Sequence, residues 1–79
     1  MAPRTSARNR LPGVITRVKH GEVMSQIDIR VGDNHVVSVI TREAAEELDL
    51  KEGDQVFAIV KATEVMVAKN GEEGDSYAT

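Results

Sequence analysis

The stretch VMSQIDIRVGDNHVVSVITREAAEEL, residues 23–48, decides the fold. Residues 23–31 have a period of two, in which Val23, Ser25, Ile27, Ile29 and Val31 alternate with Met24, Gln26, Asp28 and Arg30, and this is the pattern of a strand with one buried face. Residues 32–34 have the composition of a hairpin turn, and residues 35–40 predict the next strand. From residue 41 the apolar spacing changes to the helical period, so a short helix is predicted over 41–48.

More strands are predicted on both sides of this stretch. Residues 11–18 form one before it, and residues 55–62 and 65–69 form two after it. The helix then lies between the third and fourth strands, which is the connectivity of an OB-type barrel. We therefore predict an all-β fold, an OB-like five-stranded β-barrel.

The predicted domain covers residues 6–69. The polar residues 1–5 are predicted to be a disordered lead, and residues 70–79, rich in glycine and acid, a disordered tail. Residues 1–10 have no apolar run that would mark a signal peptide, and no stretch is long enough for a membrane helix. A soluble cytoplasmic protein with no membrane partner is expected.

The small size of the chain favours association. Seventy-nine residues make one domain at most, with a thermodynamically marginal core. No cysteine is present to form disulfides, so oligomerisation is the remaining means of stabilisation. Residues 35–40 are apolar on both faces, which suggests a contact between subunits.

Charge is spread unevenly along the chain. Residues 1–20 hold five basic residues and no acidic one, whereas the remainder holds all thirteen acids against five bases. This asymmetry predicts that the N-terminal arm meets something negative: a small anion, a phosphate backbone or an acidic neighbouring subunit. No nucleophilic cysteine, phosphate loop or zinc-type spacing is found, so neither an enzyme nor a direct metal-cation site is expected.

Three short segments carry groups suited to a tetrahedral anion. The first, Ser6-Ala7-Arg8-Asn9, offers hydroxyl, guanidinium and amide donors just before the first strand. The Arg8 guanidinium is a planar fork that matches two oxygens of such an anion. The alternative interpretation is a solvated polar arm.

The second segment is the start of the predicted helix, and the third is the end of the fourth strand. The Thr41 hydroxyl lies beside the N–H groups of Glu43 and Ala44, which favour an anion; alternatively Thr41 simply caps the helix. Lys61, followed by Ala62, lies among apolar neighbours, where a lysine needs solvent or a counter-charge. The alternative is an ordinary surface lysine.

Taken together, these segments resemble the molbindin family, the Mop or TOBE-type molybdate-binding domains. The resemblance covers about residues 5–69, and its most specific parts are SARNRLPG (6–13) and VKATEVMVA (60–68). It implies an OB-like barrel that pairs into dimers, with three dimers forming a hexamer. It also implies intracellular binding, storage or buffering of molybdate, or of tungstate, in pockets between subunits, without an organic cofactor.

The family's ligands carry over onto Ser6, Arg8 and Asn9 from one subunit and onto Thr41 and Lys61 from the facing one. The full oxyanion-binding set predicted in this way is Ser6, Ala7, Arg8, Asn9, Thr41, Ala44, Lys61 and Ala62. A family serine is replaced by Ala44, whose backbone N–H could still donate. For the family's second pocket, near the threefold axis, the candidates are Lys19, His20, Gly21 and Glu22.

Two other functions fit the predicted fold. OB barrels commonly bind single-stranded nucleic acid, but such sites need aromatic platforms and a basic groove. Phe57 and Tyr77 are the only aromatic residues, and the body of the chain is acidic, so no nucleic-acid partner is expected. The remaining alternative is an oligomerisation or regulatory module.

Overall fold

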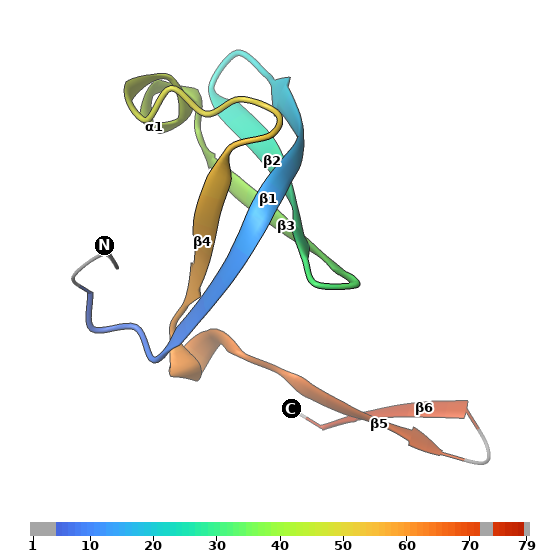
Figure 1. Cartoon of the computed structure of the whole chain (residues 1–79). Coiled ribbons are helices and arrows are strands. Elements are labelled where there is room, and N and C mark those ends of the chain that lie inside the picture. Colours follow the sequence, from blue (N-terminus) through green and yellow to red (C-terminus); the bar gives the residue numbers. More distant parts are fainter. Residues whose placement is uncertain (1–4, 72–73, 79) are drawn as a thin grey trace.

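A four-stranded antiparallel sheet with the strand order β3-β2-β1-β4 is the centre of the molecule (Figure 1). The computed structural model describes residues 5–71 and 74–78. The elements of this main body are β1 (Asn9–His20), β2 (Met24–Val31), β3 (Asn34–Thr41), α1 (Arg42–Glu47) and β4 (Gln55–Val60). A 3-10 turn and a separate hairpin follow: η1 (Ala62–Glu64), β5 (Val67–Gly71) and β6 (Gly74–Ala78).

The mostly β fold with one short helix between the third and fourth strands is confirmed. The alternating stretch forms β2, with Ser25, Ile27 and Ile29 buried on one face. The turn to β3 contains Gly32 with φ +61°, a left-handed conformation that glycine adopts without strain. Periodicity therefore identified these elements correctly, because one face of each packs on the core.

The place of the fifth strand differs from the prediction. Within the described residues, β5 pairs with β6 and with no strand of the main sheet. Residues 74–78 of the predicted disordered tail form β6, whereas residues 72, 73 and 79 lie outside the described residues, as do residues 1–4 of the predicted lead.

The long strand β1 curls the sheet towards a barrel. Its first half, from Asn9 to Val14, pairs with β4, and its second half pairs with β2. A register irregularity between Ile15 and Arg17 marks the bend, and such bulges increase the local twist. Gly13 makes this close crossing of strands feasible, because a Cβ there would lie 2.6 Å from the Arg30 carbonyl oxygen.

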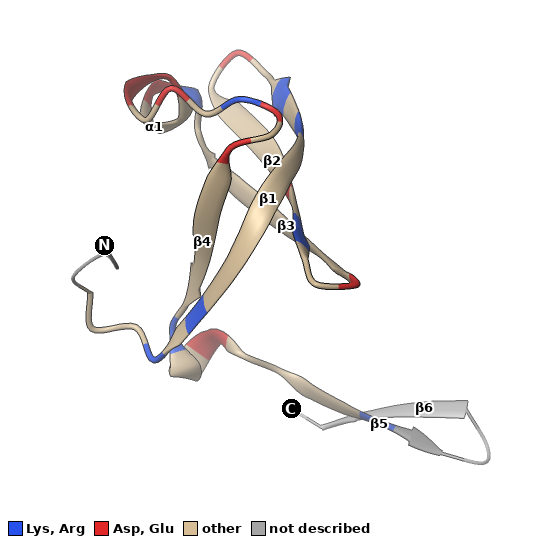
Figure 2. Cartoon of the chain, in the orientation of Figure 1, with Lys and Arg blue, Asp and Glu red and all other residues tan. Residues whose placement is uncertain are grey.

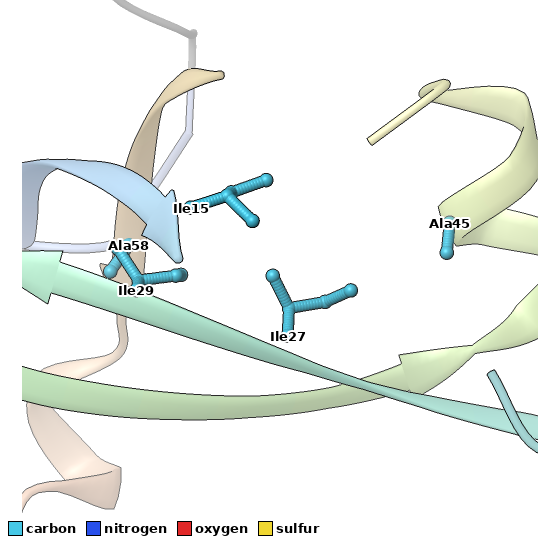
Figure 3. Close-up of a cluster of buried hydrophobic side chains, with 5 residues drawn as sticks. All are labelled: Ile15, Ile27, Ile29, Ala45 and Ala58. Atoms are coloured by element: carbon cyan, nitrogen blue, oxygen red, sulfur yellow. The ribbon is translucent and has the colours of Figure 1, made fainter. Parts of the chain in front are cut away.

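The core lies on the concave side of this curved sheet. Ile15, Ile27 and Ile29 are buried there together with Ala58 of β4 and Ala45 of α1 (Figure 3). The helix begins at Thr41 and turns its Ala45 face inward, so it covers one end of the curved sheet. The candidate site residues lie outside this core, at the two ends of the strands.

Candidate functional site

The N-terminal arm and the end of β4 lie side by side. Asn9 is the register partner of Val60, and its side-chain Nδ2 donates a hydrogen bond to the Val60 carbonyl oxygen at 3.2 Å. Lys61 follows directly. The structure therefore brings together the first and third predicted segments, which are 51 residues apart in the chain.

Within the arm, Ala7 is an anchor and its two neighbours are exposed. The Ala7 side chain is buried, and its N–H donates to Thr5 Oγ1 at 3.2 Å. Ser6 and Arg8 face solvent on either side of it. Ala7, one of the residues predicted to bind the oxyanion, therefore holds the arm in place. Its buried methyl group offers no group that could bind a ligand.

Basic residues predominate at this end of the molecule, where Glu64 of η1 is the acidic residue beside them. Figure 2 shows basic residues at the start of β1 and at the end of β4. Arg8, Arg10 and Lys61 are all exposed, and in the described part of the chain neither Arg8 nor Lys61 has a carboxylate within salt-bridge distance. Arg10, whose Nη2 donates to the Thr5 carbonyl at 3.4 Å, was not among the predicted site residues.

At Thr41 the capping interpretation is confirmed. The Ala44 N–H donates to Thr41 Oγ1 at 3.1 Å, so this N–H is already occupied. It cannot replace the missing family serine in the way the sequence prediction assumed. The hydroxyl proton of Thr41 remains available, because the cap uses only a lone pair of its oxygen.

Thr41 and Lys61 lie at opposite ends of the sheet (Figure 1). Thr41 pairs with Met24, beyond the His20 end of β1, whereas Lys61 follows the pair of Asn9 and Val60 at the other end. Eleven residue steps along β1 separate these ends, about 36 Å along the strand at roughly 3.3 Å per residue. One chain therefore cannot bring both residues to one small anion.

The placement within one chain differs from the predicted division of ligands, which grouped Lys61 with Thr41. Arg8, Asn9 and Lys61 belong to one end of one chain, and Thr41 belongs to the other end. Strand periodicity could not show this, because the grouping depends on the register between β1 and β4 rather than on either segment alone. Ala62 lies with Lys61, as the first residue of η1, and is exposed.

The second candidate pocket coincides with a shallow hollow of about 260 Å³. Lys19, His20 and Gly21 line it, but Glu22 does not. Sequence reasoning missed the other lining residues, which come from β2 and β3: Met24, Ser25, Gln26 and Val39. His20 Nδ1 and Ser25 Oγ share a hydrogen bond of 2.7 Å across the β1–β2 pair, so this histidine is held by the sheet.

None of the predicted residues lines either of two larger hollows. One, of about 630 Å³, opens on the side of β1 that carries Pro12 and Gly13. The other, of about 420 Å³, is apolar and lies on the core side of the sheet. Over residues 5–71 and 74–78, no cluster of three or more histidine and acidic side chains could hold a metal ion. No helix among the same residues is long and apolar enough to cross a membrane.

The chemistry of the candidate residues is uniform. Guanidinium, ammonium, amide N–H and hydroxyl groups all donate hydrogen bonds, and the first two carry positive charge. Such a set suits an anion that accepts hydrogen bonds at every oxygen.

Comparison with known proteins gives consistent matches. The TOBE domain family model matches residues 5–67. Molybdenum-pterin-binding protein 2 of Clostridium pasteurianum is 40% identical over 63 residues, which cover 78% of this chain and 93% of that protein. Molybdenum-pterin-binding protein MopA of Rhodobacter capsulatus is 42% identical over 72 residues, but the chain spans only 27% of its length.

A solved structure confirms the fold. The molybdate-binding protein from Sporomusa ovata superimposes with a TM-score of 0.81 at 37% sequence identity. The match covers 85% of this chain and all of the other one. Binding is the role that the names of these relatives describe.

Proposed function

The chain belongs to the TOBE domain family, and we propose that it binds molybdate in pockets where two subunits meet. The observation that carries the proposal is the cationic end formed by Arg8, Asn9 and Lys61, which lies far from Thr41 in the same chain. A pocket made from the cationic end of one subunit and the Thr41 end of another uses all of these groups.

The donor chemistry explains the choice of anion. Molybdate is a fully deprotonated dianion that accepts hydrogen bonds at all four oxygens. Monohydrogen phosphate has to donate one, whereas the charged groups of the proposed pocket, the Arg8 guanidinium and the Lys61 ammonium, only donate, which favours the fully deprotonated anion. Tungstate has the same charge and shape, so we expect it to bind as well, whereas discrimination against sulfate depends on pocket size.

The assembly that we propose is a hexamer of three dimers. Val37 and Val39 support an extended interface, since both are more than half exposed on the outer face of β3. The hollow beside Lys19 and His20 is the candidate for the second anion pocket. The role that we propose is storage or buffering of the anion in the cytoplasm, without catalysis.

Titration calorimetry tests this function. Purified protein is titrated with molybdate, tungstate, sulfate and phosphate, and then the Arg8→Ala and Lys61→Ala variants are titrated with molybdate. We expect heat from molybdate and tungstate only, and at least tenfold weaker binding in both variants, because a charged hydrogen bond contributes about 1.5–3 kcal/mol. Equal affinity in both variants would show that the site lies elsewhere.

Arg30→Ala is the matched control. Arg30 is an exposed arginine of β2 that is not in the predicted set, so its removal changes the net charge by the same amount. Molybdate affinity in this variant should stay within about twofold of the parent, since exposed charges act weakly over a distance in salt. Circular dichroism of all variants confirms that the sheet is retained.

A further inference from the structure

Asn9 joins the two segments that carry Arg8 and Lys61. Its side-chain Nδ2 donates a hydrogen bond of 3.2 Å to the Val60 carbonyl oxygen, across 51 positions of the sequence. Arg8 directly precedes Asn9, and Lys61 directly follows Val60. A single side-chain hydrogen bond therefore links the immediate neighbours of these two charged residues.

The Asn9 side chain lies on the protein side of the N-terminal arm. Burial alternates along this segment: Ala7 is buried and Asn9 is half-buried, whereas Ser6, Arg8 and Arg10 are exposed. Alternate residues of an extended segment face opposite sides, so Asn9 shares the inner side with the anchor Ala7. Ser6 and Arg8 share the outer side, where an anion can reach them.

This hydrogen bond lies at the last residue pair between β1 and β4. The pairing runs from Val14 with Gln55 to Asn9 with Val60, and Lys61 follows as the first residue outside it. The other side-chain hydrogen bonds of the arm, from the Ala7 N–H and from Arg10 Nη2, both end on Thr5 and are therefore local. Neither of them holds the arm against β4, and the end of a strand pair is where opening begins.

We propose that Asn9 is a positioning residue of the anion site: its amide keeps the last β1–β4 pair closed and fixes the backbone from which Lys61 projects before the anion arrives. The proposal rests on the proposed function, whose site it describes. It gives Asn9 a different role from the ligand role that the family resemblance implies. A lysine whose backbone is already fixed loses less conformational freedom on binding, so the affinity is higher.

A double-mutant cycle between Asn9 and Lys61 tests this role. Molybdate is titrated by calorimetry into the parent, Asn9→Ala, Lys61→Ala and the double variant. We expect Asn9→Ala to weaken binding about fivefold in the parent, the effect of roughly one neutral hydrogen bond, and less than about twofold where Lys61 is already absent. An equal loss in both backgrounds would make Asn9 an independent ligand or a general structural residue. Either this result or no loss in the parent would overturn the proposal.

Amide hydrogen exchange without the anion separates this proposal from the proposed function. The N–H groups of residues 61–65 should exchange severalfold faster than in the parent, both in Asn9→Ala and in Asn9→Leu, which keeps the volume but has no donor. Asn34→Ala, at an exposed asparagine that begins β3, is the matched control and should change neither exchange nor affinity. Unchanged exchange in both Asn9 variants would overturn the proposal even if the parent binds molybdate. Faster exchange in these variants, with no molybdate binding by the parent, would overturn only the proposed function.

Discussion

At the scale of single side chains, the start of α1 shows one residue with two separate roles. Thr41 accepts a hydrogen bond from the Ala44 N–H and keeps its own proton for a ligand. The sequence indicated Thr41 as cap or ligand, and the geometry allows both. The sequence did not show that the Ala44 N–H would be occupied by Thr41 Oγ1, because this hydrogen bond depends on the rotamer of Thr41.

Restoring the family serine should strengthen binding. Ala44→Ser adds a hydroxyl three residues after Thr41, and we expect molybdate affinity to rise about tenfold, the effect of roughly one hydrogen bond to a charged group. Titration calorimetry measures it. Ala44→Val, which adds bulk without a donor, is the control and should not gain affinity. An unchanged Kd in Ala44→Ser would remove position 44 from the pocket.

The two roles of Thr41 can be separated by substitution. Thr41→Val removes both the cap and the donor, so we expect a loss of about 1 kcal/mol in the free energy of unfolding and weaker molybdate binding. Thr41→Ser keeps the hydroxyl and should preserve both. Urea unfolding and calorimetry on the same samples report the two effects. Wild-type stability in Thr41→Val would argue against the capping hydrogen bond.

At the scale of elements, periodicity predicted whether each segment is a strand or a helix, but it did not predict which strands pair with one another. Residues 27–31 alternate because one face packs inward, and residues 35–40 are rich in β-branched apolar side chains, so β2 and β3 were predictable. The segment 65–69 is equally β-like, yet within the described residues its strand β5 pairs with β6 and joins no edge of the main sheet. The choice of a pairing partner is not encoded in the β-propensity of a segment.

The curl of β1 depends on Gly13. In Gly13→Ala the new Cβ would meet the Arg30 carbonyl oxygen at 2.6 Å and Ile29 Cγ2 at 2.7 Å. The Arg30 carbonyl oxygen belongs to the backbone of a paired strand, so moving it would disturb the strand pairing. We expect a loss of about 1–3 kcal/mol in the free energy of unfolding, typical of overpacking, measured by urea unfolding. An unfolding midpoint equal to that of the parent would show that β1 can shift to relieve the contact.

At the scale of the whole molecule, the candidate site is distributed over two distant ends. The resemblance of residues 6–13 and 60–68 to a known family predicted which residues matter. Their grouping into one end, and the separation of Thr41, required the register between β1 and β4. Under the proposed function, a single chain therefore holds two half-sites.

Charge in the exposed apolar segment should weaken the assembly. Val67→Asp places a carboxylate among the exposed apolar residues Val65, Met66 and Val67, which the proposed hexamer would cover, and an unpaired buried charge is strongly unfavourable. We expect light scattering at micromolar concentration to show a lower mass than that of the parent. Asn34→Asp, which adds the same charge at an exposed turn, is the control. An unchanged mass in Val67→Asp would place this segment outside the interface.

Subunit complementation tests the central claim, that the anion is bound by opposite ends of two chains. Thr41→Ala and Lys61→Ala chains are prepared separately, then unfolded together in equal amounts, refolded and titrated with molybdate. If the ends come from different subunits, random mixing restores about one quarter of the pockets, those that pair two intact ends. High-affinity binding at that stoichiometry, absent from either variant alone, is the predicted result. No high-affinity binding in the mixture, with mixed oligomers verified by mass, would contradict the account.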